Sequence, residues 1–423
     1  MKKYITKILL VIILIITFIS CTVSKDIETP KDAFPEHFRN TAVSNDTTSI
    51  GDLEWKNFFT EKDIVQLIDS AVTRNNDLQI ATKNIEIAQY QFTQSKWNNV
   101  PQADLFVTAE INNPSENSFT GRSLNQALGK KHIEDYSAGV SLSWEADIWG
   151  KIKNEKKGAF ANYLQSEEVK KALQTTIVAN VSQGYYNLLM LDAQLEIAKQ
   201  NVQLIDSTSN IIKLKYDAGQ VTSLAIQQTE AQKLNASQLV PLLEQNIAIQ
   251  ENALSVLTGS FPNSKKRSIA LSEIAVKNNT ATGIPSSVIA RRPDVKSAEL
   301  ALKEANANVG ITKAELYPAL RITAQGGLNS FESSNWFTMP ASLFGTALGG
   351  LTQPLLNNKR LKTQYNIAKA EREKAVLNFR QAVLVAVSEV SDALVRIQKL
   401  EQQQSFLNER VKTLQLAIKN SKL

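Results

Sequence analysis

Residues 283–328 read GIPSSVIARRPDVKSAELALKEANANVGITKAELYPALRITAQGGL, and the pattern of this stretch decides the fold class. Up to Pro318 its apolar residues recur at helical spacing, whereas Leu320, Ile322 and Ala324 alternate with polar residues. A period near 3.6 indicates an amphipathic helix and a period of two indicates a half-buried strand. The stretch therefore predicts a helix that is joined through the proline to a strand.

The same plan occurs earlier in the chain. Aligning the two segments without gaps places identical residues opposite each other: Arg74 on Arg291, Asp77 on Asp294, Ala88 on Ala305, Lys96 on Lys313 and Pro101 on Pro318. Internal repeats have to be recognised before a fold is argued. We therefore expect a tandem-repeat protomer with repeat 1 at residues 58–262, a linker at residues 263–283 and repeat 2 at residues 284–423.

Each repeat contains a predicted strand hairpin. In repeat 1 a strand follows Pro101, a polar loop covers residues 113–135, and the return strand at residues 136–148 alternates apolar and polar side chains throughout. In repeat 2 one strand follows Pro318 and another covers residues 342–353. The chain thus offers two hairpins, each with an apolar face that has to be covered.

The length and period of these strands suit an outer-membrane barrel. An open sheet edge cannot lie in lipid, and barrels begin at about 8 strands. If the strands span a membrane, several chains must therefore pool them.

Long helices are expected between the hairpins. Within residues 151–215, apolar residues from Ile177 to Ile212 follow a 4-3 spacing, broken once at Ser209, that indicates a coiled-coil seam. Residues 151–215 would extend about 95 Å as a helix. Tyr216 to Gly219 form a turn in which Gly219 is the expected C-terminal cap. A second helix returns over residues 222–257, with a bend expected at Pro241.

The second repeat contains the same seam. Placing Val181 on Val390 gives apolar residues at all matched positions except Gln404. By that shift Leu423 falls on Leu214, just before the turn of repeat 1. We therefore expect the intact protein to continue for about 40 residues through a similar turn and return helix.

The N-terminus has the features of an export signal. Three lysines, an apolar run at residues 8–19 and a small residue before Cys21 describe a secretory signal over residues 1–20. The run is shorter than the roughly 20 residues that cross a bilayer. Cys21 resembles the acylated cysteine of a bacterial lipobox, and a chance cysteine in an ordinary signal is the alternative. Residues 21–57 are expected to be a tether.

Composition argues against several functions. Two histidines and one cysteine exclude a disulfide framework and an ordinary Cys/His zinc site. No plausible nucleophile and base pair is present, so neither an enzyme nor a cofactor is expected. The formal net charge of +6 includes three lysines of the signal, and no basic patch is interleaved with aromatic residues, so no nucleic-acid role is expected.

Charged residues fall into two groups of candidates. Four carboxylates lie opposite the apolar side of the repeat 1 strands: Asp104, Glu110, Glu145 and Asp147. They would line a channel, although simple exposure to solvent explains their position equally well. For Arg291, Arg292, Pro293 and Asp294 we favour a structural role, because Pro293 would begin a helix and Asp294 would lie in its first turn. Asp77, the counterpart of Asp294, is the expected N-cap of a helix over residues 78–97.

Several motifs resemble those of the outer-membrane efflux lipoproteins, the OprM/NodT-type branch of the TolC superfamily. They are Ile284-Pro285-Ser286 with Arg291-Arg292-Pro293-Asp294-Val295, Asp147-Ile148-Trp149-Gly150, Tyr216-Asp217-Ala218-Gly219, Leu257-Thr258-Gly259 and Leu316-Tyr317-Pro318. Asn358-Lys359-Arg360-Leu361 stands where the family prefers Gly-Gly-Arg-Leu, and Leu224-Ala225 stands where it often has an acidic residue at the periplasmic tip.

The resemblance implies a mainly α fold with a membrane β-barrel. A homotrimer would form a twelve-stranded barrel and an α-helical tunnel, lipid-anchored in the bacterial outer membrane. Such a trimer conducts drugs or other small molecules passively as the exit duct of a tripartite efflux pump. Its partners would be a periplasmic adaptor, which meets the tip at Tyr216 and Gly219, and an inner-membrane transporter of the resistance-nodulation-division (RND) class. A type I protein-secretion duct and a coiled-coil structural lipoprotein without a pore are the alternatives.

Overall fold

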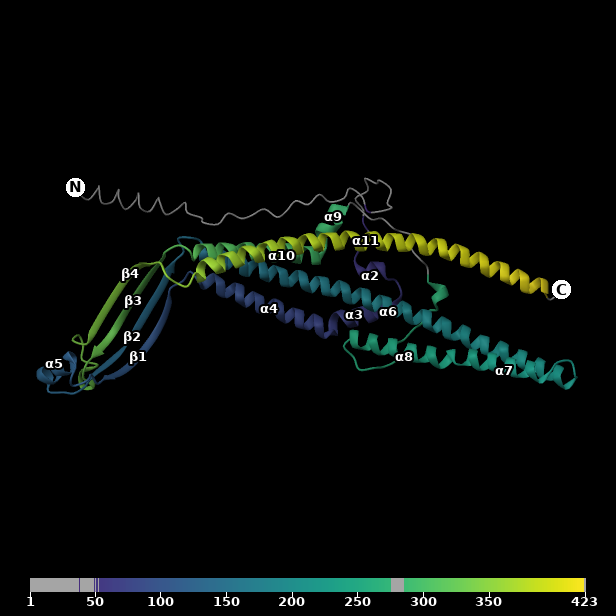
Figure 1. The fold of residues 1–423 in the computed structure, drawn as a ribbon, viewed down its shortest axis with the longest axis horizontal. Coiled ribbons are helices and arrows are strands. Elements are labelled where there is room, and N and C mark those ends of the chain that lie inside the picture. The colour runs from purple at the N-terminus through teal and green to yellow at the C-terminus, as the bar shows by residue number, and fades with distance from the viewer. Residues whose placement is uncertain (1–37, 39–48, 50, 52, 275–284, 422–423) are drawn as a thin grey trace. The chain divides into compact units, whose positions relative to one another are not determined.

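The computed structural model describes residues 38, 49, 51, 53–274 and 285–421 (Figure 1). The expected signal at residues 1–20, Cys21 and most of the expected tether lie outside these residues. The elements, in chain order, are α2 (Trp55–Phe58), α3 (Lys62–Arg74), α4 (Asn76–Trp97), β1 (Gln102–Asn112), α5 (Phe119–Leu128), β2 (Ile133–Ala146), α6 (Lys151–Asp217), α7 (Ser223–Ser237), α8 (Leu239–Leu257), η2 (Leu271–Glu273), α9 (Pro285–Arg291), α10 (Pro293–Ala314), β3 (Ala319–Ser330), η3 (Ser333–Asn335), β4 (Leu343–Thr352) and α11 (Arg360–Ser421).

The chain forms two compact units. One contains Ile87–Leu164 and Glu299–Asn378, which include the whole sheet, and the other contains the described residues within Lys31–Glu86, Gln165–Ala298 and Phe379–Leu423. The long helices α6 and α11 each contribute to both units. No helix in the described ranges is both long and apolar enough to cross a lipid bilayer.

The sheet confirms the predicted strands. Its four strands are antiparallel in the order β1-β2-β3-β4 and lie side by side in Figure 1. The two hairpins are therefore joined through β2 and β3, where Val140 pairs with Gly326. The strands β1 and β4 form the two edges of this sheet.

The connection between β1 and β2 differs from the expected polar loop, because it contains the helix α5. The side chain of Ser118 accepts a hydrogen bond from the amide of Gly121, and Gly129 ends the helix at a φ of 65°. Ser118 and Gly129 are therefore the N-cap and the end signal that favour a helix here. The polar composition of the segment concealed this short helix.

The long helical hairpin follows the prediction closely. Helix α6 contains 67 residues, and it ends in a turn in which Gly219 has a φ of 72°. The return helix is interrupted at Gln238, between α7 and α8. Because Pro241 has no N–H, it cannot donate a helical hydrogen bond to the carbonyl of Ser237, and the interruption at Gln238 confirms the bend expected near this proline.

The expected cap of α4 was wrong. Asn75, not Asp77, accepts hydrogen bonds from the amides of Asp77 and Leu78, at 2.9 and 3.2 Å. The amide group of Asn75 also donates to the carbonyl of Leu257 at 3.0 Å. Both residue types cap helices well, so the contact with the end of α8 decides between them.

The larger apolar core lies where α3, α6 and α8 meet. Its fully buried members include Ile64, Ile68, Val181, Tyr185, Leu188 and Leu254. Gly184 lets α6 and α8 approach closely, because an added Cβ would lie 2.9 Å from Cδ2 of Leu254. The coiled-coil seam predicted for α6 is thus the packing surface of this core.

Candidate functional site

One face of the sheet is apolar and exposed. Alternating residues of all four strands share this face, and the exposed ones are Leu105, Val107, Ile111, Val140, Leu142, Ile322, Leu343 and Leu351. Leu105 is 80% exposed. A contiguous apolar surface of this kind marks an interface with a partner or with a membrane.

Aromatic side chains bound this surface at both ends of the strands. Near the start of β2, the ring of Tyr136 lies 5.5 Å from that of Trp336. Beyond the other end, Trp149 stacks on Tyr317 at 4.9 Å. From Tyr136 to Ala146 the strand extends about 33 Å, or about 25 Å along a barrel axis at a tilt of about 40°. This height equals the apolar band of an outer-membrane barrel, which aromatic residues flank on both sides.

The opposite face of the sheet is mainly polar, with Asp104, Ser141, Gln325 and Thr346 in one transverse row. Its neighbouring row places Gly139 against Gly327. A Cβ added to either glycine would meet the backbone of the adjacent strand, at 2.4 and 2.1 Å. The strands β2 and β3 therefore approach each other closely on the polar side, as expected where a sheet curves around a polar interior.

The four candidate carboxylates have different surroundings. Asp104 and Glu110 are exposed on the polar face of β1. Glu145 forms ion pairs with Lys151 at 3.1 Å and Arg321 at 3.3 Å. Its charge is therefore matched by two cations from neighbouring elements.

Asp147 lies beyond the end of β2 and holds the start of α6. Its two carboxylate oxygens accept hydrogen bonds from the amides of Ile152 and Lys153, at 3.0 and 2.9 Å. Negative charge at a helix N-terminus is stabilising. The carboxylate of Asp147 is thus engaged by backbone groups, which the strand pattern alone did not indicate.

The Arg291 to Asp294 stretch joins two helices to a third. Pro293 is the first residue of α10. The guanidinium of Arg292 donates to both oxygens of Asp294, at 3.0 and 2.7 Å, and to Glu389 of α11 at 2.6 Å. These hydrogen bonds from Arg292 lower the pKa of Asp294, and they tie the start of α10 to α11. Arg291 is the last residue of α9.

The turn after α6 is closed by two backbone hydrogen bonds. Gly219 donates to the carbonyl of Tyr216 at 2.8 Å, and Gln220 donates to that of Lys215 at 2.8 Å. This is the Schellman arrangement, which needs a left-handed residue such as Gly219. Leu224, just beyond the turn, is 58% exposed.

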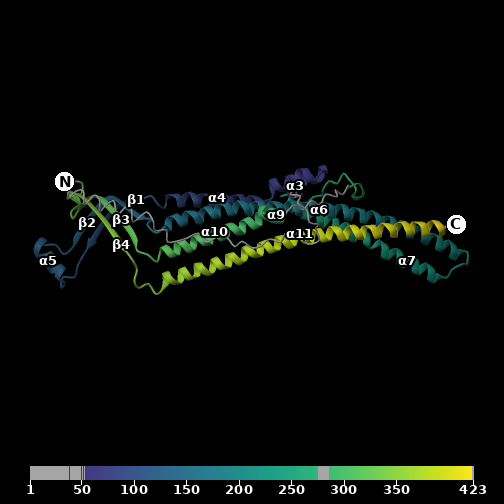
Figure 2. The same cartoon turned by 90° about the horizontal axis from the view of Figure 1, so that it is seen from above.

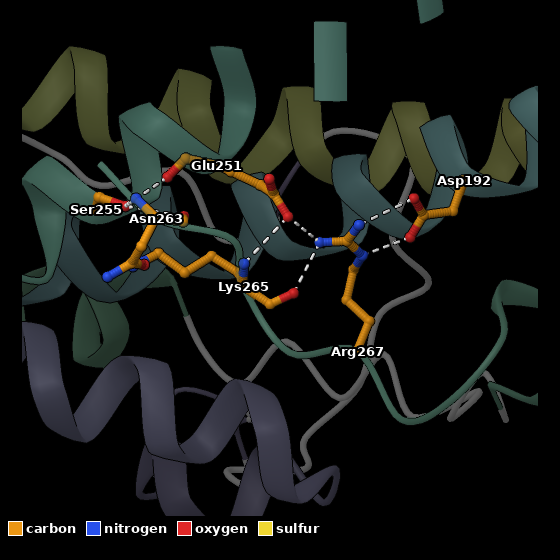
Figure 3. Close-up of polar contacts among 6 residues, drawn as sticks. All are labelled: Asp192, Glu251, Ser255, Asn263, Lys265 and Arg267. Atoms are coloured by element: carbon orange, nitrogen blue, oxygen red, sulfur yellow. Dashed lines mark hydrogen bonds and ion pairs between the residues drawn. The ribbon is translucent and has the colours of Figure 1, made fainter. Parts of the chain in front are cut away.

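A polar cluster that the sequence did not predict fastens the linker to the helical hairpin (Figure 3). Arg267 donates to both carboxylate oxygens of Asp192 on α6, at 2.5 and 3.1 Å, and to Glu251 on α8 at 2.5 Å. It also donates to the carbonyl of Lys265 at 2.8 Å. We call residues 263–268 the strap, and Arg267 with its two carboxylates the Arg267 cluster.

More of the strap is hydrogen-bonded to the same helices. The amide of Lys265 donates to Glu251 at 3.0 Å, and that of Asn263 donates to the hydroxyl of Ser255 at 3.3 Å (Figure 3). The amide of Ser268 donates to Asp63 of α3 at 2.7 Å. The expected polar link between the repeats is therefore bound along its first residues. The sequence does show charged residues in the linker and beside the coiled-coil seam, but it does not indicate which of them form ion pairs.

Comparison with known proteins gives the context of this geometry. A family model described as outer membrane efflux protein matches residues 67–260 and 284–420. The probable outer membrane lipoprotein SilC of Salmonella typhimurium is 29% identical over 407 residues, which cover 94% of this chain and 85% of SilC. The cation efflux system protein CusC of Escherichia coli K12 is 25% identical over 404 residues, covering 95% of this chain and 86% of CusC.

Solved structures show the same fold. A crystal structure of CusC superposes with a TM-score of 0.80 at 24% identity, covering 95% of this chain and 89% of that chain. The open state of the MtrE outer membrane channel of Neisseria gonorrhoeae superposes with a TM-score of 0.79 at 24% identity, covering 92% of this chain and 85% of that one. The exposed sheet and the long helices thus have the same fold as these two solved structures.

The matched residues cover more than half of the chain, and the chain belongs to the outer membrane efflux protein family. Members of this family are channel proteins and not enzymes. The resemblance seen in the Arg291 to Asp294 motif is confirmed by these matches, and so is the mainly α fold with one four-stranded sheet.

Proposed function

We propose that three copies of this chain form the outer membrane channel of a tripartite efflux pump. Three four-stranded sheets would close into one twelve-stranded barrel, with the apolar face toward lipid and the polar face toward the lumen. The observation that carries the proposal is the exposed apolar face on a sheet with two open edges, because lipid tolerates neither an open edge nor a partial barrel.

The channel would conduct drugs or other small molecules passively. Solutes would diffuse through an aqueous lumen lined by polar residues such as Asp104 and Glu110, and the channel would catalyse no reaction. The energy for export would come from an inner-membrane transporter of the RND class. A periplasmic adaptor would join the two, meeting this chain at the turn of Tyr216 and Gly219. Acylation of Cys21 would hold the N-terminal end of the tether at the outer membrane.

The repeat boundaries belong to the same proposal. Repeat 1 at residues 58–262 and repeat 2 at residues 284–423 would each supply one hairpin and its helices. The strap begins the linker at residues 263–283 and is bound to repeat 1. Arg291, Arg292, Pro293 and Asp294 would act structurally at the start of repeat 2, through the ion pairs of Arg292.

Planar-bilayer recording of the purified full-length protein tests the proposal. The expected result is a trimer by native mass spectrometry in detergent and stepwise conductance after reconstitution. A monomer that binds lipid without any conductance would overturn it and would favour a structural lipoprotein. Co-purification with an RND transporter, as opposed to an ATP-driven exporter, distinguishes drug efflux from type I protein secretion.

A further inference from the structure

The Arg267 cluster stands at a boundary in the packing of the helical hairpin. On one side of it, α6 contributes Ile177, Val181, Tyr185, Leu188 and Leu189 to the core, and α8 contributes Leu254. On the other side, from Asp192 to the turn, the buried residues of α6 are Ala198 and Ser209. Ala236 is the buried residue of α7.

The hairpin beyond the cluster is held by weak contacts. Helix α7 lies along α6 in both views (Figure 1 and Figure 2). Ion pairs join the two arms of this helical hairpin, Lys233 with Asp206 at 2.6 Å and Lys199 with Glu244 at 3.3 Å, and all four side chains are about a third to a half exposed. Exposed pairs of this kind contribute little, and the break at Gln238 weakens the return helix further. Such a region has low local stability.

The cluster itself is more strongly built. The side chains of Arg267 and Glu251 are 18% and 14% exposed. The planar guanidinium engages Asp192 with two parallel hydrogen bonds and Glu251 with a third, a geometry that lysine cannot reproduce. Without Arg267, the carboxylates of α6 and α8 would face each other without a cation between them.

We propose that Arg267 is a positioning residue that sets the pivot of the helical hairpin. It holds α6 and α8 together at the level of the strap, so that only the part of the hairpin beyond Asp192 and Glu251 separates when the channel opens. This rests on the proposed channel function. The strap thereby limits the movement to the thinly packed segment and keeps the core of α3, α6 and α8 closed.

Spin-label distances measure the pivot directly. In a Cys21→Ser background, one label pair at Gln203 and Gln232 reports on the hairpin beyond the cluster, and a second pair at Gln183 and Ala253 reports on the core side. All four positions are exposed. Labelled chains are diluted with unlabelled chains so that each trimer carries one pair. The variants compared are Arg267→Met, Arg267→Lys and, as a matched control, Lys266→Met, which removes the neighbouring exposed cation.

Arg267→Met is expected to shift the Gln203–Gln232 distances to longer values and to broaden the distribution of the Gln183–Ala253 distances, because the pivot moves into the core. Arg267→Lys is expected to have an intermediate effect, and Lys266→Met none. A triple variant that adds Asp192→Asn and Glu251→Gln to Arg267→Met distinguishes two causes of the change: loss of the hydrogen bonds of Arg267, or repulsion between the two unpaired carboxylates. If the hydrogen bonds of Arg267 hold the helices together, the broadening persists in the triple variant.

The inference is overturned if Arg267→Met leaves both distributions unchanged, if Lys266→Met changes them equally, or if the triple variant restores the wild-type distances. The channel assay is read separately. If wild-type trimers conduct and Arg267→Met conducts with a higher open fraction, both proposals stand. If no variant conducts while the distances still change, the channel function fails and the role of Arg267 in holding the hairpin remains.

Discussion

Replacing Val140 with arginine tests which face of the sheet meets lipid. Val140 lies on the apolar face, 46% exposed, paired with Leu105 and Gly326. It is about 13 Å along β2 from Tyr136 and about 20 Å from Ala146, which places it within a few ångströms of the middle of the apolar band. Arginine at a bilayer midplane costs about 2–4 kcal/mol on a lipid-facing barrel position. Each trimer would carry this cost three times.

The matched control is Ser141→Arg, one residue further along the same strand. Ser141 lies on the polar face, opposite Asp104. An arginine there would enter the aqueous lumen beside a carboxylate, so we expect little change in stability. Neighbouring positions thus give opposite results from the same substitution.

Folding from urea into lipid vesicles measures the difference. The folded fraction is followed by protection of the barrel from protease and by gel mobility without heating. Val140→Arg is expected to shift the folding midpoint to lower urea concentration and to reduce the yield of assembled trimer. Equal effects of the two variants, or a larger effect of Ser141→Arg, would refute the assignment of the apolar face to lipid.

Three further predictions concern the helical unit, each read by thermal unfolding of the full-length protein. Tyr185→Phe should stabilise it by about 1 kcal/mol, because the buried Tyr185 hydroxyl has no hydrogen-bond partner among the described residues; Tyr186→Phe, which removes a hydroxyl that donates to a carboxylate, should not. Asp294→Asn should destabilise above a pH of about 4 and lose its effect as pH falls, since the lowered pKa of Asp294 gives stability that disappears on protonation; a constant difference across pH would contradict this. Gly259→Ala should cost more than about 1 kcal/mol, because Gly259 has a φ of 62° and an added Cβ would lie 2.4 Å from the carbonyl of Arg74; an unchanged melting temperature would contradict it.

Local periodicity was enough to predict the main elements. The strand after Pro101, its return strand and both long helices occur where the spacing of apolar residues placed them. The turn at Gly219 and the break near Pro241 were also foreseen. Each of these features depends on a side chain and its near neighbours along the chain, so the pattern contains the necessary information.

Three features were missed or misplaced, one of them because it depends on a distant partner. Asn75 was passed over as a cap because its advantage over Asp77 is a contact with Leu257, which is 182 residues away. The hydrogen bonds of Asp147 to the start of α6 were also not predicted, because the strand pattern indicates only the face on which a side chain lies. The helix α5 was hidden in a polar segment whose period is too short to read.

The sequence by itself determined the alternation of the strands and the family, because burial imposes a period on every element and the motifs are local. Only the tertiary structure decided which charges meet. Arg267 and Asp192 are 75 residues apart in the chain, and no spacing rule connects a linker to two helices. Their pairing follows from the packing of α6 against α8, which brings both carboxylates within reach of one guanidinium.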